Sequence, residues 1–114
     1  MNQHYEFHVR VRVAPDGTSF KSAFGPGTAI LLRGVEKTGS LNQAAKLIGM
    51  AYSKAWKSIK NTEAQLGFFL IERHGPRGSV LSSKGKQFLN MYDEMERVAH
   101  KAVLEVLQAN GYNV

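Results

Sequence analysis

The stretch from Gly39 to Leu66, GSLNQAAKLIGMAYSKAWKSIKNTEAQL, decides the fold of this chain. It contains two helical patterns that are separated by a short break. Ser40 is a good N-cap for the first helix, and Gln43 three residues later completes the pattern of a capping box. Gly49 is expected to end this helix, because glycine adopts the left-handed conformation at little energetic cost. Two helices joined by so short a break predict a helix-turn-helix.

Each helix has an apolar face, and the second helix also has a basic one. The expected buried stripe of the first helix consists of Leu41, Ala44, Ala45, Leu47 and Ile48. The stripe of the second helix, which Gly67 ends, consists of Ala55, Ile59, Thr62 and Leu66. Its opposite face bears Ser53, Lys54, Lys57, Lys60 and Asn61. Residues 37–62 include five lysines and no acidic residue, which is typical of an element that contacts phosphates.

The composition limits the remaining possibilities. A chain of 114 residues has room for one domain with a modest core, and 43% hydrophobic residues are ordinary for a soluble protein. No apolar run approaches the length of a membrane span, and the lack of cysteine fits a cytoplasmic location. Residues 37–88 hold nine Lys and Arg against two Glu, whereas residues 89–114 hold two against four acidic residues. This uneven charge favours nucleic acid as a partner.

The residues before the helix-turn-helix predict a β-hairpin and one more helix. Apolar and polar residues alternate from His4 to Val13, which indicates a half-buried strand. Pro15, Asp16 and Gly17 form a turn motif, so Thr18 to Phe24 is expected to return as the second strand. After a break at residues 25–27, Thr28 is expected to cap a helix that ends near Gly39. Its buried stripe would be Ile30, Leu31, Leu32 and Val35.

A two-stranded ribbon is expected after the helix-turn-helix. Residues 68–73 and 79–81 are short apolar runs, and residues 74–78 between them form a loop rich in glycine and proline. A helix-turn-helix followed by such a ribbon is a winged helix. Arg77 at the tip of the ribbon is expected to enter a minor groove or to contact a phosphate.

The C-terminal part predicts one long helix, capped by Ser82 or Ser83 and ending near Asn110. At 1.5 Å per residue it is about 40 Å long, which exceeds the dimension of a small domain. An apolar stripe that extends beyond the core needs a partner, so we expect a dimerisation helix. The alternative is that the stripe packs on the chain's own hairpin. The stripe consists of Phe88, Tyr92, Met95, Ala99, Ala102 and Val106.

Neither a metal site nor catalysis is indicated. On a strand, His4 and His8 lie about 13 Å apart, so one ion cannot bind both. The sequence has no cysteine nucleophile and no plausible Ser-His-carboxylate set. We therefore expect no metal, no cofactor and no enzymatic activity.

Several short motifs resemble a known family, the N-terminal domain of the molybdate-responsive regulators (ModE), and more loosely the winged helix of LysR-type regulators. The matching residues are Gly39-Ser40, Ala44-Ala45, Gly49-Met50, Tyr52, Ala55-Trp56, Ile59, Leu70, Glu72-Arg73, Leu81-Ser82 and Gly85. The resemblance implies a domain that binds operator DNA as a homodimer, with the second helix of the motif in the major groove. It also implies that the long helix and the N-terminal strands contribute to dimerisation.

Two features depart from the family pattern. Ala51 stands where the family usually has serine, so the recognition helix loses a cap that contributes about 1 kcal/mol. The molybdate-binding domains of the family would follow this segment, and the chain ends at Val114. Direct molybdate binding is therefore not expected.

Together these features predict an α+β, mostly α, fold. An N-terminal β-hairpin (1–24) would precede the winged helix-turn-helix (25–82), and a long dimerisation helix (83–114) would follow. Trp56 is expected to pack in the core rather than to stack on a base. The alternative function is a winged helix used only for protein interaction, which the polar outer face of the motif disfavours. Contacts to DNA are expected from Tyr52, Ser53, Lys54, Lys57, Lys60, Arg73 and Arg77.

Overall fold

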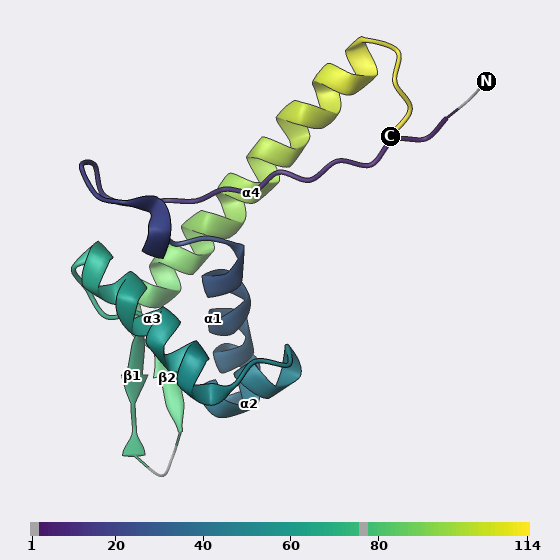
Figure 1. Cartoon of the computed structure of the whole chain (residues 1–114). Helices are drawn as coiled ribbons and strands as arrows, with labels where there is room; N and C mark the ends of the chain where they lie inside the picture. The colour runs from purple at the N-terminus through teal and green to yellow at the C-terminus, as the bar shows by residue number, and fades with distance from the viewer. Residues whose placement is uncertain (1–2, 76–77) are drawn as a thin grey trace.

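Three helices, α1 (Pro26–Thr38), α2 (Leu41–Leu47) and α3 (Tyr52–Leu66), pack around one apolar core (Figure 1). The computed structural model of the chain describes residues 3–75 and 78–114. Helices α2 and α3 are the predicted helix-turn-helix. The core is formed mainly by aliphatic side chains from these helices and by the aromatic rings of Phe24 and Tyr92.

The ribbon and the last helix follow in the predicted order. Strands β1 (Ile71–Arg73) and β2 (Ser79–Leu81) pair antiparallel, and α4 (Ser83–Ala109) leads away from the core (Figure 1). The hydroxyl of Ser82 caps α4 by accepting a hydrogen bond of 2.8 Å from the backbone N–H of Gly85. The winged helix with a long C-terminal helix is therefore confirmed, although β1 is shorter than the apolar run at 68–73 suggested.

Helices α1 and α2 pack closely because small residues form their contact. A Cβ atom added at Gly34 would lie 2.6 Å from the Cβ of Ala44, so no larger residue fits at position 34. The predicted cap of α2 is present, since the hydroxyl of Ser40 accepts from the N–H of Gln43 at 3.2 Å. The second half of the capping box is not formed by Gln43, because the N–H of Ser40 donates to the hydroxyl of Thr38 instead.

Some predicted boundaries and buried stripes differ from the structure. Helix α1 begins at Pro26, which is favoured at the first helical position, and Thr28 is buried inside its first turn. Ile30 is 46% exposed, Leu47 64% and Ile48 41%, so these three side chains lie outside the core. For Leu47 and Ile48 the reason is that helix α2 has only seven residues and turns a narrow face to the core. Ile30 lies on α1, whose buried residues are Thr28, Ala29, Leu31, Leu32 and Val35.

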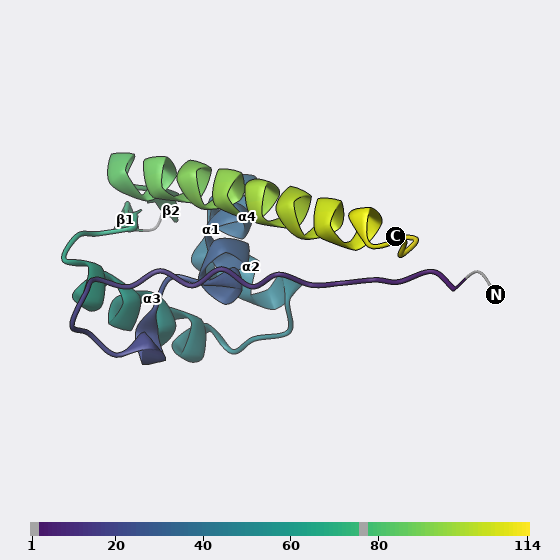
Figure 2. The ribbon, with the colours of Figure 1, turned by 90° about the horizontal axis from the view of Figure 1, so that it is seen from above.

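The predicted N-terminal β-hairpin is wrong. Within residues 3–75 and 78–114, the segment 5–12 belongs to no strand. Between the two predicted hairpin strands, only Val13 and Phe24 form a bridge, with two hydrogen bonds of 2.8 Å, whereas His4 forms a bridge with Asn113 near the C-terminus. Residues Phe20–Ser22, expected in the second strand, form the 3-10 helix η1. The alternation did identify an extended segment. That segment runs beside α4 rather than beside a second strand (Figure 2).

Contacts with α4 explain the course of this segment. The hydroxyl of Tyr92 donates a 2.7 Å hydrogen bond to the carbonyl of Val11, and the ring of Phe7 lies 4.5 Å from that of His100. Burial raises the pKa of Tyr92 to about 12, and the charge of Glu96 adds to this shift. At neutral pH the hydroxyl is protonated, as that of any tyrosine with an ordinary pKa is, and the raised pKa extends the range in which it can donate to higher pH. The segment is held by side chains of a helix, which offers no free backbone edge for a β-ladder.

Candidate nucleic-acid interface

Helix α3 separates a buried face from a basic one. Its buried residues are Ala55, Ile59, Thr62 and Glu63, at helical spacing. The predicted DNA-contacting residues of this helix are all exposed, namely Tyr52, Ser53, Lys54, Lys57 and Lys60. No side chain caps the start of α3 at Ala51, as the sequence predicted. The first amide groups of this helix therefore have no side-chain partner at the N-cap.

The ribbon is joined to α3 through one arginine. The guanidinium of Arg73, on β1, lies 3.9 Å from the ring centroid of Trp56 and donates a hydrogen bond to the hydroxyl of Tyr52. The ammonium of Lys60 also lies over Trp56, at 4.7 Å from the centroid. Trp56 is therefore only half-buried. It packs against the core, as predicted, but it also supports two of the predicted DNA-contacting cations.

A polar hollow of about 360 Å³ lies where α2, α3 and the ribbon meet. The ribbon is fixed there, because the N–H of Ser79 donates to the carbonyl of Gly39 at 2.9 Å. Gly78 has a φ of +94°, and a Cβ atom at this position would lie 2.2 Å from the same carbonyl oxygen. Arg77 lies outside the described residues, and its contact with DNA stays a prediction. The hollow is lined by Ser40, Leu41, Asn42, Tyr52, Arg73, Gly75, Gly78 and Ser79.

The structure adds a basic residue that sequence reasoning missed. Lys21 on η1 lines a second hollow together with Lys54 and Lys57 of α3. Residues 18–24 were expected to form a strand, so their position beside α3 was not foreseen. The only sequence signals near this region are the alternation of residues 4–13 and the turn motif at residues 15–17. Neither indicates against which element the residues after the turn pack.

Residues 30–86 match the family described as bacterial regulatory helix-turn-helix protein, lysR family. The chain belongs to this family. Its matched region begins within α1 and ends at the start of α4, so it includes the whole helix-turn-helix and the ribbon.

Curated relatives of this lysR-family chain are regulators of transcription. The transcriptional regulator ModE of Yersinia pestis is 32% identical over 81 residues, which cover 68% of this chain and 31% of that protein. The DNA-binding transcriptional dual regulator ModE of Escherichia coli (strain K12) is 31% identical over the same shares. The chain thus spans about a third of the length of these relatives (31%). The predicted function, a DNA-binding transcriptional regulator, agrees with this family and these relatives.

A solved structure shows the same fold. The crystal structure of a CbnR DBD–DNA complex matches with a TM-score of 0.60 and 24% sequence identity. The match covers 72% of this chain and 93% of that one.

In the part of this lysR-family chain that the structure describes, no cluster of three His, Asp or Glu is placed to hold a metal ion. No described helix is long and apolar enough to cross a membrane.

The predicted dimerisation stripe on α4 is divided in the structure. Tyr92 is 0% exposed and its ring lies 5.1 Å from that of Phe24, while the ring of Phe88 lies 4.7 Å from Phe24. These two residues therefore pack in the chain's own core, and Tyr92 has no surface left for a partner. The uniform spacing of the stripe did not show this, because the core covers only its beginning. The open part forms an apolar hollow of about 340 Å³ lined by Met91, Glu94, Met95, Val98, Ala99 and Ala102.

Proposed function

We propose that this lysR-family chain binds a specific sequence of duplex DNA as a homodimer and so regulates transcription. The observation that supports the proposal most is the exposed face of α3, where lysines and small polar residues stand without acidic residues. An α-helix fits the major groove of B-DNA. In such a position Lys54 and Lys57 contact phosphates, and Ser53 offers a hydroxyl to a base edge.

The ribbon supports this face in two ways. Arg73 holds the hydroxyl of Tyr52 at the start of α3, where helix-turn-helix proteins contact base edges. Arg73 and Lys60 also place positive charge on the ribbon side of the helix. Lys60 contributes less net charge than Lys57, because its ammonium lies 3.8 Å from the carboxylate of Glu63.

Replacing Lys57 with alanine should weaken DNA binding roughly tenfold or more, since a dimer loses two phosphate contacts. The loss should be similar for all DNA sequences, because phosphate contacts do not read bases. Fluorescence anisotropy with a duplex selected from random DNA measures the effect. Lys101→Ala, an exposed lysine on the far half of α4, is the matched control. An unchanged affinity of Lys57→Ala would argue against major-groove binding by α3.

The homodimer is proposed because α4 bears an exposed apolar strip, formed by Met91, Val98 and Val106. Val98 is 52% exposed, Val106 63% and Met91 43%, and these side chains lie on one side of the helix. The N-terminal segment packs on the neighbouring side through Tyr92 and His100. A second copy placed on the strip would cover the apolar side chains and would present two recognition helices to a palindromic site.

Val98→Glu should convert the dimer into a monomer, because the interface would bury two unpaired carboxylates. Light scattering measures the mass, and the affinity for the selected duplex should fall because a monomer contacts only one half-site. Gln108→Glu adds the same charge to an exposed position of α4 away from the strip and should leave the dimer intact. A wild-type protein that is monomeric at tens of micromolar would refute the dimer.

A further inference from the structure

We propose that the loop bearing η1 binds a phosphate of the DNA backbone, on the flank of α3 opposite the ribbon. The site is the hollow between η1 and α3, and its ligand is a phosphodiester of the duplex. This inference deepens the proposed function and rests on it. The family match begins at residue 30, so the loop lies outside the region that defines the family.

The hollow has the chemistry of a phosphate site. Its volume is about 270 Å³, and three lysines from two separate elements line it, Lys21 from η1 and Lys54 and Lys57 from α3. The other polar residues of the lining carry hydroxyl or amide groups, and no described residue of the lining has a carboxylate; they are Ser22, Thr28, Ser58, Asn61 and Thr62. Within residues 3–75 and 78–114, none of the three lysines forms a salt bridge. Their charge is therefore available for an anion that accepts several hydrogen bonds.

The loop is held in place before any ligand binds. The side-chain amide of Gln65, near the end of α3, donates to the carbonyl of Ser19. The hydroxyl of Ser19 in turn accepts from the N–H of Lys21 at 3.1 Å, and the bridge between Val13 and Phe24 closes the base of the loop. Because the backbone is already ordered, binding loses little conformational entropy beyond that of the lysine side chains.

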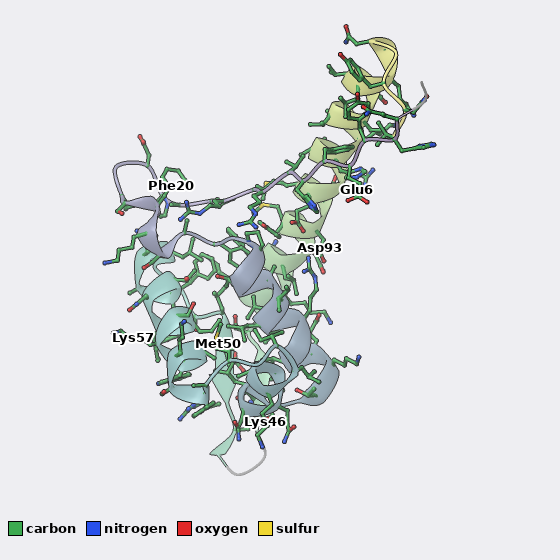
Figure 3. All side chains as sticks on the ribbon, turned by 45° about the vertical axis from the view of Figure 1, so that its right-hand side comes forward. Glu6, Phe20, Lys46, Met50, Lys57 and Asp93 are labelled. Atoms are coloured by element: carbon green, nitrogen blue, oxygen red, sulfur yellow. The ribbon has the colours of Figure 1, made fainter. Side chains whose placement is uncertain are left out.

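The loop lies where a phosphate backbone would run if α3 occupied the major groove of DNA. A helix with its side chains is about 10–12 Å across and fills a major groove about 12 Å wide, so each flank of the helix meets one phosphate backbone. The ribbon lies on one flank, with Arg73 stacked on Trp56. Lys54, Ser58 and Asn61 lie on the other flank, where η1 packs against α3 (Figure 1). Figure 3 shows the loop that bears Phe20 on the same side of the molecule as Lys57 of α3. The recognition helix thus has a basic element on both sides.

The experiment compares the wild type, Lys21→Ala, Lys21→Arg, Lys57→Ala and the control Lys101→Ala on one selected duplex over a range of salt concentrations. Lys21→Ala should bind roughly three- to thirtyfold more weakly, and its slope of log affinity against log salt should be shallower by about one to two per dimer. Lys21→Arg should keep the wild-type slope, because it retains the charge. Gln65→Ala releases the loop from α3 and should weaken binding while Lys21 is still present. Thermal unfolding shows that each variant is folded.

Three outcomes would overturn the inference. If Lys21→Ala matches Lys101→Ala in affinity and slope while Lys57→Ala binds weakly, the loop is not a DNA contact, although the proposed function stands. If the wild type binds no duplex at all, the proposed function fails as well. Calorimetric titration with inorganic phosphate distinguishes a free anion from DNA. We expect no heat of binding, and micromolar affinity for phosphate would show that the hollow is a site for a free anion instead.

Discussion

Raising the salt concentration from 50 to 200 mM should lower the affinity of this protein for its selected duplex by about 10³-fold or more. The reason is the release of counterions from DNA when lysines and arginines neutralise phosphates. Each chain offers the exposed cations Lys21, Lys54, Lys57, Lys60 and Arg73 around the recognition helix. A dimer that places most of them on the backbone neutralises roughly six to ten phosphates, the range for which such a loss is typical.

Anisotropy titrations of the same duplex with the same protein, repeated at several salt concentrations, give the slope of log affinity against log salt concentration. The double variant Lys54→Gln, Lys57→Gln should show a clearly shallower slope, since each dimer loses four charges. Gln108→Glu on α4 should keep the wild-type slope, because its position is remote from the basic face. An affinity that stays constant between 50 and 200 mM would contradict electrostatic binding of DNA by this face.

Ala55→Lys should abolish the folded state. Ala55 is 0% exposed at the contact between α3 and the core, so the variant must bury an ammonium group without a partner or force the helices apart. Either change costs several kcal/mol, which is comparable with the whole free energy of unfolding of a small domain, about 5–15 kcal/mol. Circular dichroism should show a weak helical signal and no cooperative thermal transition.

Ala64→Lys is the matched control. Ala64 belongs to the same helix, nine positions further along, and is exposed. The same substitution there should change the free energy of unfolding by no more than about 0.5 kcal/mol. If Ala55→Lys unfolded cooperatively within a few degrees of the wild type, the assignment of the buried face of α3 would be wrong.

The sequence by itself determined the helix-turn-helix, the ribbon and the long helix, because their determinants are local. Ser40 caps α2 through its own side chain, and glycines with positive φ follow the ends of α1, α2 and α3, at Gly39 (74°), Gly49 (69°) and Gly67 (85°). The spacing of Ala55, Ile59 and Thr62 also fixed which face of α3 is buried, and therefore which face is basic. Caps and periodic spacing depend on residues within one or two helical turns of each other, so they can be read without the rest of the chain.

Only the tertiary structure decided which elements lie beside which. Alternation in residues 4–13 predicts an extended segment, but the choice between a strand and α4 as its neighbour depends on the hydroxyl of Tyr92, 81 positions away from Val11. The same long-range packing buries Tyr92, partly buries Phe88 and leaves Ala102 and Val106 exposed on a stripe that looks uniform in sequence. It also places Lys21 beside Lys57. These outcomes depend on contacts between distant residues, and periodicity within a segment holds no information about which distant segment it meets.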